Sequence, residues 1–246
     1  MDIDYTKTVL LEVDIQNDFC PAYKGKNGRE HPPGALAVTG GDEVIGTLNS
    51  LAERVRRKGG KVLATQDWHP AGHVSFASSH PGKQQGDIII VPVSEKAVEI
   101  FMKQYPQLKD PIPAAMQQVL WPDHCVQNTE GAAFHESLDT TLISFVFRKG
   151  YHKNIDSYSA FFENDRCTPT DLYGYLKQQG IETILIGGLA TDYCVYYSVT
   201  DSIRLGFTTY CVHDACAGID LPTGSLKRAV ASMKDRGALF APAADF

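Results

Sequence analysis

TILIGGLATDYCVYY, residues 183–197, carries the clearest fold signal in this chain. Its apolar run at residues 184–186 is typical of a buried parallel strand, and Val195 and Val199 follow with helical spacing. Glycines separate the two patterns, as a tight turn requires. The stretch predicts a strand, a turn and a helix, with Cys194 at the helix N-terminus, where backbone N–H groups favour a thiolate and can hold an oxyanion.

The rest of the chain repeats this alternation of short apolar runs and helical patterns, which is typical of βαβ units around a parallel sheet. The expected strands are residues 8–14, 61–65, 141–147, 183–187, 207–213 and a short one near 238–240. The expected helices are 44–55 ending at Gly59, one from Thr168 to Gly180, one after Cys194, and one starting near Thr223 or Ser225. We therefore predict an α/β fold with a parallel sheet of about six strands, flanked by helices on both faces.

One segment, residues 78–120, breaks this rhythm. It contains a possible edge strand at 88–91, a short helical pattern at 98–105, and three prolines in the turns that follow. We interpret it as an insertion into a single domain that spans residues 1–246. Self-association or a lid over the site are the two roles that we consider for it.

Composition excludes several classes of protein. The 246 residues are 43% hydrophobic with a net charge of −6, which suits a globular core and argues against nucleic acid as a partner. The N-terminal MDIDYTKTVLLEVD lacks the basic region of a signal peptide, and no apolar run has the length of a membrane span. Six scattered cysteines suit a reducing compartment without disulfides. We expect a cytoplasmic protein.

Ionisable residues of complementary type stand at the ends of three expected strands. Asp14 closes the first strand, Lys149 follows the strand at 141–147, and Cys194 lies beyond the strand at 183–187. In an open parallel sheet, ligands bind outside these carboxyl ends. A carboxylate can take the proton of a thiol nucleophile, and an ammonium can stabilise the anion. Each residue alone also has a structural explanation: Asp14 could cap a turn, Lys149 could be a solvated charge, and Cys194 could be an inert core thiol.

A second group of candidates lies in DWHPAGH, residues 67–73. Asp67 and His69 alternate, so an extended backbone directs both side chains to one side. A carboxylate with imidazoles suits zinc, manganese or iron(II). His124 in WPDHC is the obvious third ligand, and His73 is a possible fourth. Such a set leaves positions open to water or substrate, unlike a closed structural zinc site.

Five ordered motifs together resemble the nicotinamidase/pyrazinamidase family of isochorismatase-like cysteine hydrolases. They are VDIQNDF (13–19), DWHPAGHVSF (67–76), WPDHCV (121–126), FRKG (147–150) and GLATDYC (188–194). The resemblance implies a three-layer isochorismatase-like fold. It also implies a metal-dependent amidohydrolase that converts nicotinamide to nicotinate and ammonia through a cysteine thioester, in pyridine nucleotide salvage, with pyrazinamide as a further substrate.

The same resemblance assigns roles to individual residues. It implies a catalytic triad of Asp14, Lys149 and Cys194, and one divalent metal, zinc before iron or manganese, on Asp67, His69 and His124. It implies a cis peptide between Leu189 and Ala190 that directs the N–H groups of Ala190 and Cys194 into an oxyanion hole. It implies a substrate pocket walled by Phe19, Trp121 and Tyr158. His73 matches a metal ligand in some members only.

Two alternatives remain open from the sequence. The chain could hydrolyse another small amide or a ureido compound, although the relatives that do so lack the Asp67, His69, His124 pattern. It could instead be a non-catalytic metal-binding or thiol-sensor protein, but a sensor has no need of Asp14 and Lys149 beside its cysteine. Homo-oligomerisation is possible under each reading.

Overall fold

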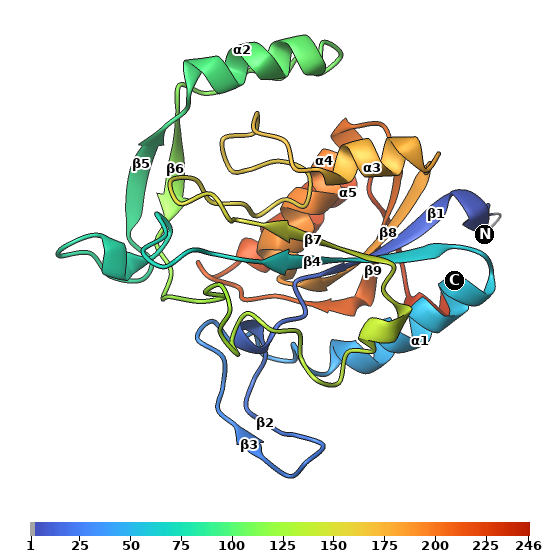
Figure 1. Cartoon of the computed structure of the whole chain (residues 1–246). Helices are drawn as coiled ribbons and strands as arrows, with labels where there is room; N and C mark the ends of the chain where they lie inside the picture. The colour runs from blue at the N-terminus through green and yellow to red at the C-terminus, as the bar shows by residue number, and fades with distance from the viewer. Residues whose placement is uncertain (1–2) are drawn as a thin grey trace.

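Six parallel strands form the central sheet of the computed structural model, which describes residues 3–246. The strands are β1 (Thr8–Val13), β4 (Lys61–Asp67), β7 (Phe145–Lys149), β8 (Thr183–Leu189), β9 (Thr208–Ala217) and β10 (Leu239–Ala241). Their order across the sheet is β10-β9-β8-β1-β4-β7, and every pairing is parallel (Figure 1). The predicted parallel sheet of about six strands is confirmed.

Helices cover both faces of this sheet and complete the predicted three layers. They are α1 (Val44–Arg57), α3 (Leu172–Gln178), α4 (Tyr196–Arg204) and α5 (Ser225–Asp235), whereas α2 (Glu95–Gln104) lies away from the sheet. One core packs α1 against Leu10, and the other packs α3, α4 and α5 against Val9 and Leu11 on the opposite face (Figure 1). Within residues 3–246, none of the helices combines the length and the apolar character needed to cross a bilayer.

Two elements begin several residues later than predicted because local hydrogen bonds override the sequence pattern. The strand expected at 141–147 begins only at Phe145, since the Asp139 side chain accepts from the N–H of Thr141 and stabilises a 3-10 turn at Thr140–Leu142. The helix expected from Thr168 begins at Leu172. Thr168 does not cap it, because its hydroxyl donates to the Asp165 carboxylate at 2.6 Å.

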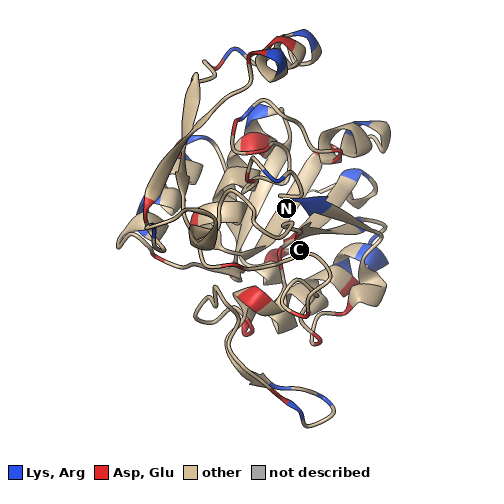
Figure 2. Ribbon diagram, turned by 60° about the vertical axis from the view of Figure 1, so that its left-hand side comes forward, with Lys and Arg blue, Asp and Glu red and all other residues tan. Residues whose placement is uncertain are grey.

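The segment 78–120 forms an arm beside the sheet (Figure 1). Strands β5 (Ile88–Pro92) and β6 (Ala115–Val119) pair antiparallel in a separate two-stranded sheet, with α2 between them in the chain. The expected strand at 88–91 is therefore present, but its partner β6 was not predicted. Acidic and basic residues alternate on α2, where Lys103 and Glu99 pair at 2.7 Å (Figure 2). That the arm is an insertion into one domain stays a prediction.

The arm is anchored to the body by aromatic packing. Phe101 of α2 is fully buried, and its ring lies 5.7 Å from that of Phe162. Tyr105 packs against the same ring at 5.4 Å and against Tyr173 at 5.6 Å. These edge contacts bury large apolar surfaces, so α2 is part of the core on that side of the sheet.

Glu12 is an ionisable side chain in the middle of the central strand β1. It is 2% exposed, and its Oε2 has no hydrogen-bond partner within the described residues. Burial, with a smaller effect of Asp139, raises the pKa of Glu12 to about 8. The side chain is thus neutral in the folded protein at pH 7 and ionised in the unfolded chain.

This difference predicts a pH-dependent stability. Because the folded pKa of Glu12 lies above the unfolded value, the folded state holds an extra proton between about pH 4.5 and 8. The free energy of unfolding should therefore fall as pH rises through this window, by up to about 1.4 kcal/mol per pH unit from this group. Glu12→Gln should remove that slope, as measured by urea unfolding at pH 5 to 9. Glu53→Gln on the exposed face of α1 is the control, and parallel curves for Glu12→Gln and wild type would contradict the prediction.

Candidate active site

The carboxyl ends of four neighbouring strands bring the predicted chemical groups together. Asp14 follows β1 directly, Asp67 ends β4, Lys149 ends β7, and Ala190 follows β8. Register places Asp67 opposite Lys149. Because parallel strands end at the same edge of a sheet, these residues meet although they are far apart in sequence.

A buried ammonium group lies at the centre of this edge. Lys149 is 1% exposed, and its Nζ lies 2.9 Å from Asp14 Oδ2, 2.6 Å from Asp67 Oδ1 and 3.4 Å from Cys194 Sγ. It also donates to the carbonyl oxygen of Ser157 at 2.8 Å. Burial alone lowers the pKa of Lys149, but the two carboxylates outweigh it and raise that pKa well above its ordinary value. The ammonium is therefore charged and links the two acids to the thiol.

Asp14 is fixed on the other side of the ammonium. Its backbone has a φ of 52°, a left-handed conformation that is uncommon outside glycine. The Thr65 hydroxyl donates to Asp14 Oδ1 at 2.7 Å and accepts from the Asp14 N–H at 3.2 Å. Burial raises the pKa of Asp14, with Lys149 opposing this effect. A carboxylate with raised basicity is suited to take a proton from a neighbouring thiol.

Cys194 lies in a π-helical turn, Thr191–Val195, that precedes α4. A carboxylate oxygen of Asp14, one of Asp67 and the Cys194 Sγ all lie within 4.8 Å of one another. Burial raises the pKa of Cys194 well above its ordinary value, and Lys149 only partly offsets this. Burial thus opposes the thiolate that a helix N-terminus was expected to favour, and a base beside the sulfur would assist its deprotonation.

The backbone before Cys194 runs close to β1. The Leu189–Ala190 peptide bond is cis, as predicted. Gly188 has a φ of 129°, and a Cβ at this position would lie 2.2 Å from the carbonyl oxygen of Val13. Only glycine fits there, which explains the glycine of the GLATDYC motif.

Three further side chains form a candidate metal centre beside the thiol. Asp67, His69 and His124 each offer one ligand atom, and these atoms lie within 4.8 Å of one another. The Nδ1 of His69 contacts the carbonyl oxygen of Gly150 at 2.8 Å, and that of His124 contacts the carbonyl oxygen of Pro122 at 2.8 Å. Because a carbonyl only accepts, each Nδ1 carries a proton, which leaves each Nε2 as the nitrogen available to a metal. Burial lowers the pKa of His69, but Asp67 and Asp156 outweigh it and raise that pKa to about 9, so a metal would have to displace a proton from Nε2.

The unsatisfied atoms at this centre fit a metal. His69 is fully buried, and its Nε2 has no hydrogen-bond partner among residues 3–246. A buried polar atom without a partner is costly unless a ligand engages it. A carboxylate with two imidazoles matches zinc, iron(II) or manganese chemistry. Gly150 makes room for this ring, since a Cβ there would lie 2.5 Å from His69.

His73, the possible fourth ligand, is occupied by the protein. Its Nε2 lies 3.0 Å from the carbonyl oxygen of His152 and 3.1 Å from that of Ile155, and its Nδ1 lies 2.7 Å from the Ser75 hydroxyl. Burial and nearby His69 lower the pKa of His73 to about 4. His73, His69 and Asp156 also form a compact group. The hydrogen bonds of both His73 nitrogens nevertheless favour the set that contains His124.

A narrow cavity opens onto the thiol and His124. All three aromatic residues predicted for substrate binding, Phe19, Trp121 and Tyr158, line it. The Trp121 indole donates to the Tyr158 hydroxyl at 3.0 Å, so the two walls are tied together. The cavity thus combines flat apolar sides with the ionisable groups at one end.

Asp156 and Ile219 are among the wall residues that sequence reasoning missed. Asp156 is buried, with Oδ1 3.8 Å from His69 Nε2 and Oδ2 accepting from Gln118 Nε2 at 2.8 Å. Ile219 is held over the cavity because Asp192 accepts from its N–H at 2.9 Å. Both lie in loops without a periodic pattern, so the sequence offers no signal for them except the Asp192 of the GLATDYC motif.

Comparisons with known proteins agree with this arrangement. The family model described as isochorismatase domain matches residues 8–245, and the chain therefore belongs to that family. Within it, the nicotinamidase of Acinetobacter baylyi is 41% identical over 228 residues, which cover 93% of this chain and 89% of that protein. The resemblance to nicotinamidases that the sequence motifs predicted is confirmed.

Solved structures show the same relationship. The structure described as Acinetobacter baumanii nicotinamidase pyrazinamidase is 39% identical, covers 98% of each chain and has a TM-score of 0.79. The pyrazinamidase of Pyrococcus horikoshii, solved in complex with zinc, is 29% identical with a TM-score of 0.66 and covers 96% of this chain and 99% of its own. The three-layer fold is therefore shared across the full length.

The hydrogen bonds of the histidines predict different effects of two substitutions. His124→Ala should weaken metal binding by roughly 100-fold or more, because it removes a free Nε2 lone pair. His73→Ala should leave the stoichiometry of bound metal unchanged, because both its nitrogens serve the protein. Metal content after dialysis against zinc, measured by mass spectrometry, checks both. Equal metal loss in the two variants would place His73 among the ligands.

Proposed function

We propose that this protein hydrolyses the amide bond of nicotinamide to give nicotinate and ammonia. Family membership and the activities named for its relatives support this proposal. The observation that carries it is the contact of Lys149 with both Asp14 and Cys194, at the end of a cavity that also holds His124. A base, a thiol nucleophile and a metal centre then face one substrate.

Asp67, His69 and His124 are the residues that would hold the metal. A divalent ion bound there would coordinate the pyridine nitrogen of nicotinamide and so orient its amide toward the thiol. Zinc is our first candidate, with iron or manganese as alternatives, and the zinc complex of the Pyrococcus horikoshii relative supports this order. The free Nε2 of buried His69 supports the choice of ligands.

Proton transfer between Asp14 and Cys194 would drive the reaction. Asp14 takes the thiol proton as the Cys194 sulfur attacks the amide carbon, and the N–H groups of Ala190 and Cys194 stabilise the oxyanion. The C–N bond then breaks, ammonia leaves with the proton from Asp14, and a thioester remains. Asp14 next deprotonates water, which hydrolyses the thioester to nicotinate and frees the thiol. Lys149 stays protonated and compensates the negative charge on Asp14 and on the sulfur.

The aromatic walls would hold the ring of the substrate. Phe19 and Trp121 offer flat surfaces, and the Tyr158 hydroxyl is fixed by Trp121. Because pyrazinamide has a ring of the same size with a nitrogen in the same position, we propose it as a second substrate. Release of nicotinate would place the reaction in pyridine nucleotide salvage.

Ammonia release tests the proposal directly. The purified protein should release ammonia from nicotinamide, lose this activity after chelation, and regain it when zinc, iron(II) or manganese is returned. The rate is followed by a coupled ammonia assay. If the metal-loaded protein releases ammonia from other small amides or ureido acids but not from nicotinamide, the substrate is wrong although the chemistry stands.

The thiol is tested separately. Cys194→Ala should lower kcat on the order of 10⁴-fold or more, because no other group in the cavity can form the thioester. Nicotinamide should still bind, as calorimetry would show, since the ring and metal contacts remain. Cys167 is a buried thiol in the core on the α3 side of the sheet. Cys167→Ala is therefore the matched control and should retain activity. Comparable turnover by Cys194→Ala would remove this residue as the nucleophile.

A further inference from the structure

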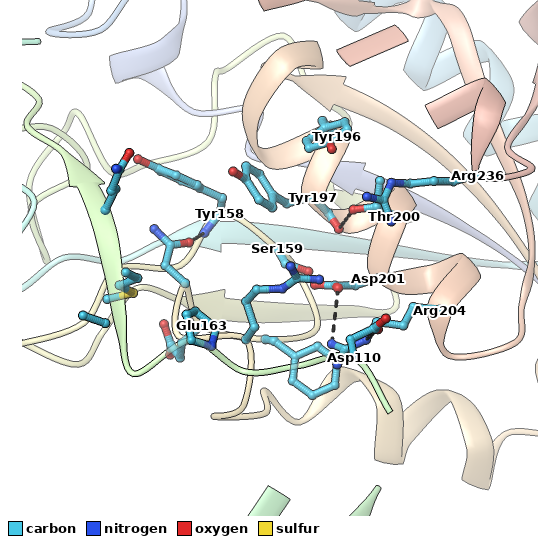
Figure 3. A pocket seen from close by; sticks show the side chains of 17 residues that line it. Asp110, Tyr158, Ser159, Glu163, Tyr196, Tyr197, Thr200, Asp201, Arg204 and Arg236 are labelled. Carbon is cyan, nitrogen blue, oxygen red and sulfur yellow. Dashed lines mark hydrogen bonds and ion pairs between the residues drawn. The ribbon is translucent and has the colours of Figure 1, made fainter. Parts of the chain in front are cut away.

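A second cleft lies between the arm and the body, outside the catalytic cavity. Its volume is about 310 Å³, and its walls come from β6, residues 158–166, α4 and Arg236 (Figure 3). Figure 3 shows Tyr196, Tyr197 and Thr200 along α4, with Tyr158 on the side that faces β6. This volume falls within the range that accommodates a small organic ligand.

The acidic residues of this cleft are neutralised within the protein. Asp110 accepts from Arg204 Nε at 2.6 Å, and Asp201 lies 3.9 Å from the same guanidinium. Glu163 pairs with His152 at 3.1 Å. Within residues 3–246, each carboxylate of the cleft therefore has a basic neighbour, and Asp110 and Asp201 share one guanidinium.

Two other arginines of the cleft, unlike Arg204, form no ion pair with a carboxylate of the described residues. Among residues 3–246, neither Arg166 nor Arg236 has a carboxylate within 4.0 Å. The Nε of Arg236 donates only to the Ser232 hydroxyl, at 3.4 Å. Both guanidinium groups thus lie in the cleft without an ion pair to the described residues, although Arg166, at longer range, opposes the burial that raises the pKa of Asp201. Guanidinium groups bind carboxylate and phosphate with paired N–H donors.

Aromatic side chains supply the rest of the surface. Tyr197 is 38% exposed, and its ring centre lies 5.3 Å from that of Tyr158 and 5.0 Å from that of Tyr196. Tyrosine rings present large flat surfaces at low entropic cost and stack well on other rings. The cleft therefore offers an anion site next to an aromatic platform.

Tyr158 connects this cleft to the catalytic cavity, because it lines both. Gln118 of β6 donates to the Tyr158 hydroxyl at 3.2 Å and to Asp156, beside the metal centre, at 2.8 Å. Asn164, another wall of the cleft, donates to Gln118 Oε1 at 3.1 Å and accepts from the Tyr158 N–H at 2.9 Å. A ligand that shifts Asn164 or Tyr158 thus acts on the substrate wall.

We propose that the cleft between β6 and α4 binds a small aromatic molecule that carries a phosphate or carboxylate group, and that its occupancy changes substrate binding through Tyr158. Arg166 and Arg236 bind the anion, and Tyr197 stacks on the ring. The binding of a ligand to the cleft is independent of the proposed amidase activity. The effect of that ligand on substrate binding rests on the proposed activity.

Calorimetry on the full-length protein tests the binding of a ligand to the cleft. The probes are AMP, which joins a ring to a phosphate, and benzoate, which joins a ring to a carboxylate. Adenosine, which lacks the anion, and inorganic phosphate, which lacks the ring, are the controls. At least one of AMP and benzoate should bind, and adenosine and phosphate should bind at least about tenfold more weakly. Arg166→Gln and Arg236→Gln should each weaken binding about tenfold, since each loses charged hydrogen bonds. Arg57→Gln on α1 is the matched control and should bind as wild type does.

Several results would overturn the inference. These are the absence of binding by both AMP and benzoate at millimolar concentration, binding of adenosine or of phosphate as tight as that of the probes, and wild-type affinity for the probe in the two arginine variants. Displacement of the probe by nicotinamide in a simple competitive manner would also overturn it, because the probe would then occupy the catalytic cavity.

Steady-state kinetics test the link through Tyr158. A saturating probe should change the KM for nicotinamide by about fivefold or more, a typical size for coupling between two sites. Gln118→Leu should retain the binding of the probe but lose this change in KM, because Gln118 joins Tyr158 to Asp156. An unchanged KM in wild type with a bound probe would refute the coupling. If wild type releases no ammonia from nicotinamide, the proposed function fails while the calorimetric result on the cleft still stands.

Discussion

The structure depends on one buried ammonium group shared by two carboxylates and a thiol. Lys149 lies within 2.9 Å of Asp14 and 2.6 Å of Asp67, and all three are almost wholly excluded from solvent. Removing water from three charges is costly, and only mutual compensation together with good hydrogen bonds makes it tolerable. The loss of Lys149 would leave two carboxylates in the interior without their ammonium partner. The proposed catalytic groups thus also stabilise the fold at this edge of the sheet.

The parallel sheet is what allows this charge cluster to form. β1, β4 and β7 are neighbours in the sheet, so Asp14, Asp67 and Lys149 meet although up to 135 positions separate them in the chain. Gly188 lets β8 approach β1 closely enough to bring Cys194 to the same edge. His69 and His124, the candidate metal ligands, are oriented by hydrogen bonds to backbone carbonyl groups rather than to side chains. Most of the precision of the site therefore comes from main-chain geometry.

The sequence predicts those parts that depend on periodicity and on strand ends. The apolar runs place β1, β4 and β8 correctly, and the topology of a parallel sheet then brings Asp14 and Lys149 together. The sequence cannot predict features that depend on contacts between separate segments. These features are the pairing of β6 with β5, the hydrogen bond of Thr168 that leaves α3 to begin later than expected, and the position of Asp156. Nor does the sequence reveal that burial raises the pKa of Cys194 despite the nearby ammonium of Lys149. The roles assigned to the site residues stay predictions, because geometry alone does not show turnover.

The arm contributes to the active site more directly than either a lid or a self-association element would. Gln118 on β6 bonds to Tyr158 and Asp156, and Trp121, which follows β6 closely, forms another wall of the cavity. His124 lies only a few residues further along the same segment. The position of the arm therefore influences where the candidate metal ligand His124 and two walls of the cavity lie. Because α2 packs its Phe101 into the core, a displacement of the arm has to disturb that packing before it reaches the catalytic cavity.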